Sequence, residues 1–382
     1  MSVLLTSSFA QCALRLDYCS IKQTGPLRTL SDAFADASSQ RLSNPWLTRQ
    51  TSSCSEGAPT STWYSSSAMN TEEFRDVDGL WMHSFFPEVL IRSAMTYRPR
   101  PDDVFIVTYP KCGTTWTQYL VLSILSKGHP PTKAVDFMLA SPYLEMMGSE
   151  AAETMVRPGV LKTHLPFTKQ PYSKQAKYIY VARNPYDVCV SYYYHMRSMT
   201  PKSVTDVSFG KFHEMFIAGK VSYGDYFDHL LSWYEHRQEQ NVLFFTYEQM
   251  KADTDFWTVQ IASFLDETYG KELRNNPTLL RRVVDATSFS NMKDVFNDEV
   301  QTLVKDMLDL PDDKLIKSMV VYRQKVTSTE EMHEDDGYIR KGIVGDWKGH
   351  FTAEQIERTK MWIAEKTKGS DVMYLWKDLD LP

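Results

Sequence analysis

The chain has 382 residues, which allows one large domain because α/β folds often exceed about 250 residues as a single unit. Hydrophobic residues make up 42% and charged residues 24%, a composition that excludes a chain dominated by disorder, collagen-like sequence or coiled coil. The formal net charge of -6 gives no electrostatic basis for non-specific binding to nucleic acid, so any anion site must be local.

Cysteine usage favours a reducing compartment, because the five cysteines form no C-x-x-C pair and no Cys/His zinc spacing. The longest apolar runs, such as residues 119–125, are far shorter than the ~20 residues that span a bilayer. We therefore predict a cytoplasmic protein without a membrane anchor.

The first 68 residues differ from the rest, since 22 of them are Ser or Thr and apolar periodicity is poor. We predict a disordered extension over residues 1–68 and a folded domain over residues 69–382. Scattered arginines faintly suggest an organellar transit peptide, but Asp17, Asp32 and Asp36 count against one. Met69 precedes the better patterned segment, so translation starting there is an alternative.

Strands and helices alternate after Met69, which predicts a central parallel sheet flanked by helices. A β-branched run over residues 103–109 leads through a turn into a helix over residues 114–125. A second strand over residues 177–182 leads into a helix entered through Pro185, and a third strand covers residues 241–246. Further helices are predicted over residues 209–218, over residues 226–238, and from Thr352, which has a capping-box partner in Gln355.

The turn Tyr109-Pro-Lys-Cys-Gly-Thr-Thr-Trp116 joins the first strand to its helix, where α/β proteins bind phosphate on unpaired helix N–H groups. Lys111 adds a positive charge, and Gly113 allows close approach of the backbone. The turn is not a Walker loop, because its lysine precedes the glycine. On these features alone, an anion site and an ordinary strand-to-helix turn are equally supported.

This turn resembles the phosphosulfate-binding loop of the cytosolic sulfotransferases, T-Y-P-K-[SC]-G-T-[TN]-W, a P-loop-like strand–loop–helix. Four further segments match the same family in order and spacing, and together they span nearly all of residues 75–360. They are Leu161-Lys-Thr-His-Leu-Pro166, the segment over residues 181–193, the pair Thr246-Tyr-Glu248 with Thr287-Ser-Phe-Ser-Asn-Met292, and Arg340-Lys-Gly-Ile-Val-Gly-Asp-Trp-Lys348.

The resemblance implies a sulfotransferase domain that uses 3'-phosphoadenosine-5'-phosphosulfate as sulfuryl donor and needs no metal. His164 would be the general base, although a lone histidine in this context is more often structural. Lys111 and Lys162 would contact the phosphosulfate. The remaining residues that the family assigns to the donor are Cys112, Gly113, Thr114, Thr115 and Trp116 of the loop, Arg183, Ser191, Arg340, Lys341 and Gly342 around the 3'-phosphate, and Tyr247, Thr287 and Phe289 near adenine.

The acceptor is predicted only as a class. Phe85 and Tyr143 fall in segments that line the family's acceptor pocket beside His164, which suits a small phenol, catecholamine, steroid, other alcohol or amine. Cys112 lies near a helix N-terminus and Lys111, so we also hypothesise a thiol with a lowered pKa that is open to oxidation, against the alternative of an inert buried thiol.

A homodimer is a weaker expectation. Many cytosolic sulfotransferases dimerise through a K-x-x-x-T-V-x-x-x-E segment, which is missing between Lys293 and Asp335. An insertion with charges at helical spacing occupies residues 297–327 instead.

Two other classes remain open. A P-loop phosphotransferase would use a similar strand–loop–helix, but it should show a Walker lysine and carboxylates for Mg²⁺. A non-catalytic protein could bind the nucleotide or a small ligand as a carrier, and turnover distinguishes it. A membrane-bound carbohydrate sulfotransferase is disfavoured by the lack of an N-terminal anchor.

Overall fold

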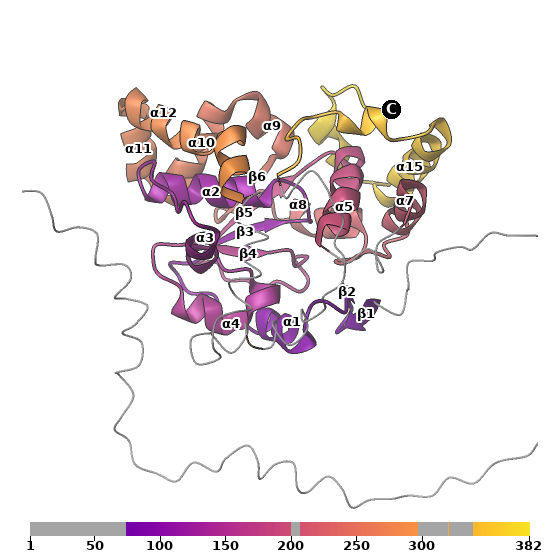
Figure 1. Cartoon of the computed structure of the whole chain (residues 1–382), viewed down its shortest axis with the longest axis horizontal. Coiled ribbons are helices and arrows are strands. Elements are labelled where there is room, and N and C mark those ends of the chain that lie inside the picture. The colour runs from indigo at the N-terminus through magenta and orange to yellow at the C-terminus, as the bar shows by residue number, and fades with distance from the viewer. Residues whose placement is uncertain (1–73, 200–206, 297–319, 321–338) are drawn as a thin grey trace, which may run out of the picture. The chain divides into compact units, whose positions relative to one another are not determined.

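The computed structural model describes residues 74–199, 207–296, 320 and 339–382 (Figure 1). The extension predicted over residues 1–68 and, apart from Val320, the insertion over residues 297–327 lie outside the described residues. In the described ranges, none of the helices combines the length and the apolar character needed to cross a membrane.

The centre of the fold is a four-stranded parallel sheet in the order β4-β3-β5-β6. Its strands are β3 (Val104–Thr108), β4 (Leu161–Thr163), β5 (Lys177–Ala182) and β6 (Val242–Thr246). These segments are rich in β-branched and aromatic residues, as expected for strands covered on both faces. The predicted parallel sheet is confirmed, with β5 at its predicted bounds.

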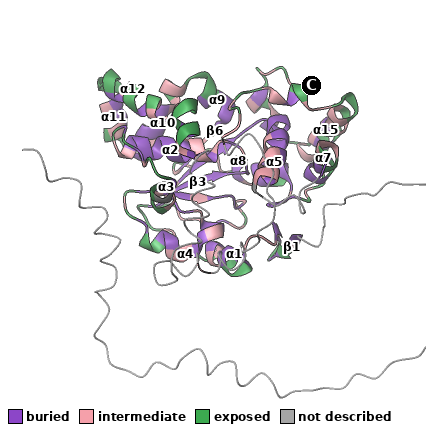
Figure 2. Ribbon diagram, in the orientation of Figure 1, coloured by how far each residue is buried: buried purple, intermediate pink, exposed green. Residues whose placement is uncertain are grey.

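Alternate side chains of the strands enter two separate cores, as the period of a strand requires. Figure 2 shows β3 coloured largely as buried. Phe105 and Tyr178 point to one face, while Ile106 and Ile179 point to the other. The first face is covered by α5 (Pro185–Met199), α7 (Phe209–Ile217), α8 (Tyr226–Tyr234) and α15 (Ala353–Lys366). The second is covered by α2 (Thr114–Leu125), α9 (Tyr247–Ala252), α10 (Thr254–Leu265), α11 (Glu267–Asn275) and α12 (Pro277–Ala286).

Shorter elements complete the described part of the chain. The antiparallel hairpin of β1 (Phe74–Val77) and β2 (Leu80–His83) precedes α1 (Glu88–Met95), which packs against α4 (Leu144–Thr154) (Figure 1). The remaining elements are α3 (Ala134–Ala140) and the 3-10 helices η3 (Asp346–Gly349) and η4 (Val372–Trp376).

Most predicted helices are confirmed. Helix α2 has its predicted bounds, and α15 begins with the predicted capping box between Thr352 and Gln355. Helix α8 ends at Tyr234 rather than at residue 238. The backbone tightens there, because the N–H groups of His236 and Arg237 bond carbonyls three residues back, which closes turns instead of extending the α-helix.

Candidate active site

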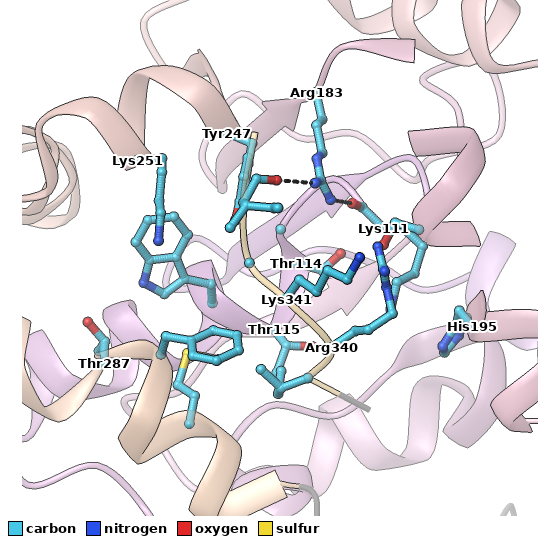
Figure 3. A pocket seen from close by; sticks show the side chains of 18 of the residues that line it. Lys111, Thr114, Thr115, Arg183, His195, Tyr247, Lys251, Thr287, Arg340 and Lys341 are labelled. Atoms are coloured by element: carbon cyan, nitrogen blue, oxygen red, sulfur yellow. Dashed lines mark hydrogen bonds between the residues drawn. The ribbon is translucent and has the colours of Figure 1, made fainter. Parts of the chain in front are cut away.

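A cavity of about 300 Å³ lies at the carboxyl end of the sheet (Figure 3). Because β3 is central, the loop that follows it lies beside the ends of β4 and β5, where ligands of α/β proteins bind. Most of the predicted site residues line this one cavity. They are Lys111, Gly113, Thr114, Thr115, Trp116, Lys162, His164, Arg183, Ser191, Tyr247, Thr287, Phe289, Arg340, Lys341 and Gly342.

Three predicted site residues do not line this cavity. Cys112 is fully buried, and burial raises the pKa of its thiol, so the hypothesis of a reactive thiol with a lowered pKa is wrong. Phe85 packs edge-on against Phe86, with ring centroids 5.7 Å apart. The Tyr143 ring lies 4.0 Å from the Lys162 ammonium and edge-on to the His164 imidazole, so Tyr143 does lie beside the proposed base.

The loop between β3 and α2 is shaped by left-handed backbone. Lys111 has a φ of 72° and Gly113 a φ of 100°. A Cβ atom on Gly113 would lie 2.9 Å from the Tyr247 ring, so glycine is required by both conformation and space. Burial, then the charges of Lys162 and Arg183, lower the pKa of Lys111 to about 7. The loop therefore lies where positive charges are close together, and a bound anionic ligand would reduce the repulsion between them.

Arg183 links this loop to the distant segment over residues 340–345. Its guanidinium donates to the Lys111 carbonyl at 3.2 Å and to the Ile343 carbonyl at 3.0 Å (Figure 3). It also stacks over the Tyr247 ring at 4.4 Å. The distant segment is itself anchored by Asp187, whose carboxylate accepts from the N–H groups of Gly345 at 2.8 Å and of Trp347 at 3.1 Å.

Arg340 and Lys341 bring two more positive charges to the cavity wall (Figure 3). Both contact Asp346, with the Lys341 ammonium 2.8 Å from the carboxylate. Although burial acts in the opposite direction, the hydrogen bonds from Lys341 and Arg340 lower the pKa of Asp346. Asp346 thus stays ionised and holds the two cations in place beside the cavity.

His164 is held as a neutral imidazole of defined tautomer. Its Nδ1 lies 2.7 Å from the Thr108 carbonyl oxygen, which can only accept, so Nδ1 carries the proton and Nε2 keeps a lone pair. Burial, then the charge of Lys162, lower the pKa of His164 well below its usual value. The side chain can therefore accept a proton at Nε2.

The structure adds residues that the sequence analysis missed. Tyr194, His195 and Ser198 line the cavity together with Ser191. Tyr194, His195 and Ser198 follow Ser191 by three, four and seven residues, which places all of them on one face of α5. This spacing indicates site residues only when that face of the helix is already known to border the cavity. Lys251, one turn after Tyr247 on α9, also lines the cavity.

Fold and site together define a P-loop-like α/β protein with a cationic cavity beside a neutral histidine. Residues 101–326 and 314–371 match the family model of the sulfotransferase domain. The chain belongs to the sulfotransferase family and is an enzyme of the cytosolic sulfotransferase type.

Known members of the family resemble most of the chain. The amine sulfotransferase of Oryctolagus cuniculus is 33% identical over 282 residues, which cover 72% of this chain and 84% of the relative. Sulfotransferase 1E1 of Bos taurus is 33% identical over 317 residues, which cover 80% of this chain and 97% of the relative.

Solved structures share the fold. Mouse sulfotransferase SULT7A1 complexed with PAP has a TM-score of 0.56 and 27% identity, and the match covers 80% of this chain and 98% of that one. A retinol dehydratase in complex with androsterone and PAP, with a TM-score of 0.59 and 20% identity, supports the fold alone. That match covers 79% of this chain and 92% of the dehydratase.

Proposed function

We propose that this enzyme transfers a sulfuryl group from 3'-phosphoadenosine-5'-phosphosulfate to the hydroxyl or amine of a small acceptor. The observation that carries the proposal is the placement of His164, with its Nε2 free of the tautomeric proton, in the same cavity as Lys111 and Lys162. A proton acceptor and fixed cations are the two elements that transfer of an anionic group requires.

The cavity suits the nucleotide donor. Among the described residues, the Nε of Arg183 is buried without a hydrogen-bond partner and would be satisfied by a phosphate oxygen. Trp116 and Phe289 offer aromatic surface for a base. The complex of mouse SULT7A1 with PAP supports the assignment, because PAP is the donor without its sulfuryl group.

In the proposed reaction the acceptor loses its proton to Nε2 of His164. The acceptor atom forms a bond to sulfur as the bond from sulfur to the phosphate oxygen breaks. Lys111 and the N–H groups at the start of α2 stabilise the charge on the departing phosphate, and Lys162 stabilises the transferring group. Arg183, Ser191, Arg340, Lys341 and Gly342 would bind the 3'-phosphate, so that ATP leaves their donors unpaired.

The acceptor is proposed as a class of small molecules, namely phenols, catecholamines, steroids, other alcohols or amines. The aromatic side chains next to His164 support flat acceptors, because Tyr143 and Tyr223 both lie edge-on to the imidazole at 5.3 Å. The name of the amine sulfotransferase supports an amine within this range. A cytoplasmic location is part of the proposal, because the cysteine usage favours a reducing compartment.

The proposal is tested by transfer of labelled sulfate from the donor to a panel of these acceptors. We expect transfer by the wild-type chain and loss of it in His164→Ala. His213→Ala is the matched control, because His213 is also buried but hydrogen-bonds Thr359 at 2.8 Å, away from the cavity. Tight nucleotide binding without transfer would instead favour the carrier, and Mg²⁺-dependent transfer from ATP would favour the phosphotransferase.

A further inference from the structure

The outer edge of β4 is paired in an unusual way. Alternate N–H groups along it donate outward, from Val160 to the Ala140 carbonyl at 3.1 Å and from Lys162 to the Pro142 carbonyl at 2.9 Å. The next donor in this series is the N–H of His164, and it meets the side chain of Glu145 at 2.6 Å. At His164, the proposed base, a carboxylate oxygen thus replaces a backbone carbonyl as the hydrogen-bond acceptor.

The neighbouring segment explains why a side chain replaces a backbone carbonyl at this position. Helix α4 begins at Leu144, so its backbone carbonyls turn along the helix axis and can no longer pair with β4. Glu145 lies in the first turn, where a carboxylate is stabilised by the helix dipole. From there the side chain reaches back to His164 N–H and to the Thr163 hydroxyl, which is 3.1 Å away.

Glu145 is fully buried, a costly position for a carboxyl group. Burial raises its pKa to about 7, against the opposing effect of the His164 and Thr163 hydrogen bonds. Its second oxygen has no hydrogen-bond partner among the residues described. The hydrogen bonds from Thr163 and His164 thus fix one oxygen of a side chain that is costly to bury, and they direct that oxygen at the backbone of His164.

The other side of the same loop is held by rigid partners. The His164 carbonyl accepts from the Nε2–H of His229 at 3.0 Å, and the Leu165 carbonyl accepts from the indole N–H of Trp233 at 3.1 Å. His229 is fixed in turn by a hydrogen bond of 3.0 Å between its Nδ1 and the Tyr180 hydroxyl. Glu145 supplies the matching anchor on the amide side.

We propose that Glu145 is a positioning residue for His164, which rests on the role of His164 as the base. By holding the His164 N–H, the carboxylate fixes the peptide plane so that Nδ1–H meets the Thr108 carbonyl and Nε2 faces the cavity. Glu145 acts through His164 and does not line the cavity itself.

The test separates arm length from charge. Glu145→Gln keeps the length and the acceptor oxygen but removes the charge, whereas Glu145→Asp keeps the charge on an arm too short to reach His164. We expect kcat to fall within about fivefold in Glu145→Gln and about 10²-fold in Glu145→Asp, because a small displacement of a catalytic group costs a large factor in rate. Nucleotide Kd should stay within about twofold in both, as Glu145 is remote from the phosphate clamp.

Amide hydrogen exchange at His164 gives a readout that does not depend on turnover. Protection should persist in Glu145→Gln and be lost in Glu145→Asp. Thr359→Val is the control for a lost buried hydrogen bond elsewhere, and it should leave kcat and His164 protection unchanged. The proposal is overturned if kcat is higher in Glu145→Asp than in Glu145→Gln, or if the His164 amide is equally protected in the two variants. If the wild-type chain transfers no sulfuryl group, the proposed function fails, while exchange still reports whether Glu145 holds His164.

Discussion

Two of the segments that line the cavity are loops that obtain their shape in opposite ways. The loop over residues 109–113 is joined directly to β3 and α2, and left-handed backbone at Lys111 and Gly113 sets its course. The loop over residues 340–345 comes from far along the chain and is held by the carboxylates of Asp187 and Asp346. The first shape is a local property, whereas the second depends on tertiary contacts.

This difference predicts that mutations in the two loops have different effects. A change in the loop over residues 109–113 should affect the chemical step or the stability of the fold, since its backbone is continuous with the sheet. A change in the anchors of the loop over residues 340–345 should affect nucleotide binding first, because that loop can move without unfolding the sheet.

The largest effect is expected from Lys111→Ala. Removing a cation that stabilises the departing phosphate should lower kcat by about 10²- to 10³-fold, as for a lost oxyanion donor, with a smaller effect on Kd. Single-turnover transfer and titration of PAP separate the two quantities. Lys220→Ala is the matched control, since Lys220 stacks on Trp81 outside the cavity and its loss should leave both unchanged. An equal loss in rate and affinity would contradict a role in the transition state.

The anchor Asp187 should come next. Asp187→Ala removes the acceptor for the N–H groups of Gly345 in the distant loop and of Trp347 just after it, so Kd for PAP should rise about ten- to a hundredfold while kcat at saturation changes little. Calorimetric titration measures the Kd for PAP, and turnover at saturating nucleotide measures kcat. Asp228→Ala is the control, because it removes an exposed carboxylate that pairs with Lys366 and anchors no loop in the part of the chain that the structure describes. Unchanged affinity in Asp187→Ala would mean that the distant loop keeps its shape without this anchor.

The sequence was enough to predict what is local. The strand over residues 177–182, the helix over residues 114–125 and the capping box at Thr352 follow from periodicity and end signals, and the structure has them where expected. The family motifs named residues that the fold does bring to one cavity, although their individual roles stay predictions.

What the sequence could not give depends on contacts between distant residues. Nothing in the sequence marks Asp187 or Glu145 as an anchor, and only the fold places one beside Gly345 and the other beside His164. The error at Cys112 has the same origin. Proximity to a helix N-terminus suggested a lowered pKa, but the packing of the sheet buries the thiol completely, and desolvation outweighs the nearby charge of Arg183.

A smaller effect is expected from pH. Lys111 has a pKa of about 7 in the free protein, and a bound anion beside it must raise that pKa. Nucleotide affinity should therefore be full below about pH 7 and fall as the pH rises toward the raised value, by at most about tenfold per pH unit for one proton. Titration in two buffers of different ionisation enthalpy should show proton uptake on binding. Lys111→Arg, which stays charged, should flatten the profile, and proton release by the wild-type chain would contradict the assignment.

The smallest effect compares one glycine from each loop. Gly113 and Gly345 both have left-handed φ values, of 100° and 86°, so alanine strains either backbone by about 1 kcal/mol. The surroundings differ, because an added Cβ at Gly345 meets nothing within 4 Å, whereas at Gly113 it would lie 2.9 Å from the Tyr247 ring.

That ring cannot easily retreat, since the Arg183 guanidinium lies 4.4 Å from its centroid. Denaturant unfolding should therefore show a loss of about 1 kcal/mol in Gly345→Ala and about 2–3 kcal/mol in Gly113→Ala. Equal losses would mean that the ring moves aside. A larger loss at Gly113 would show that the local loop is specified by steric fit as well as by backbone conformation, while the distant loop depends on its carboxylate anchors.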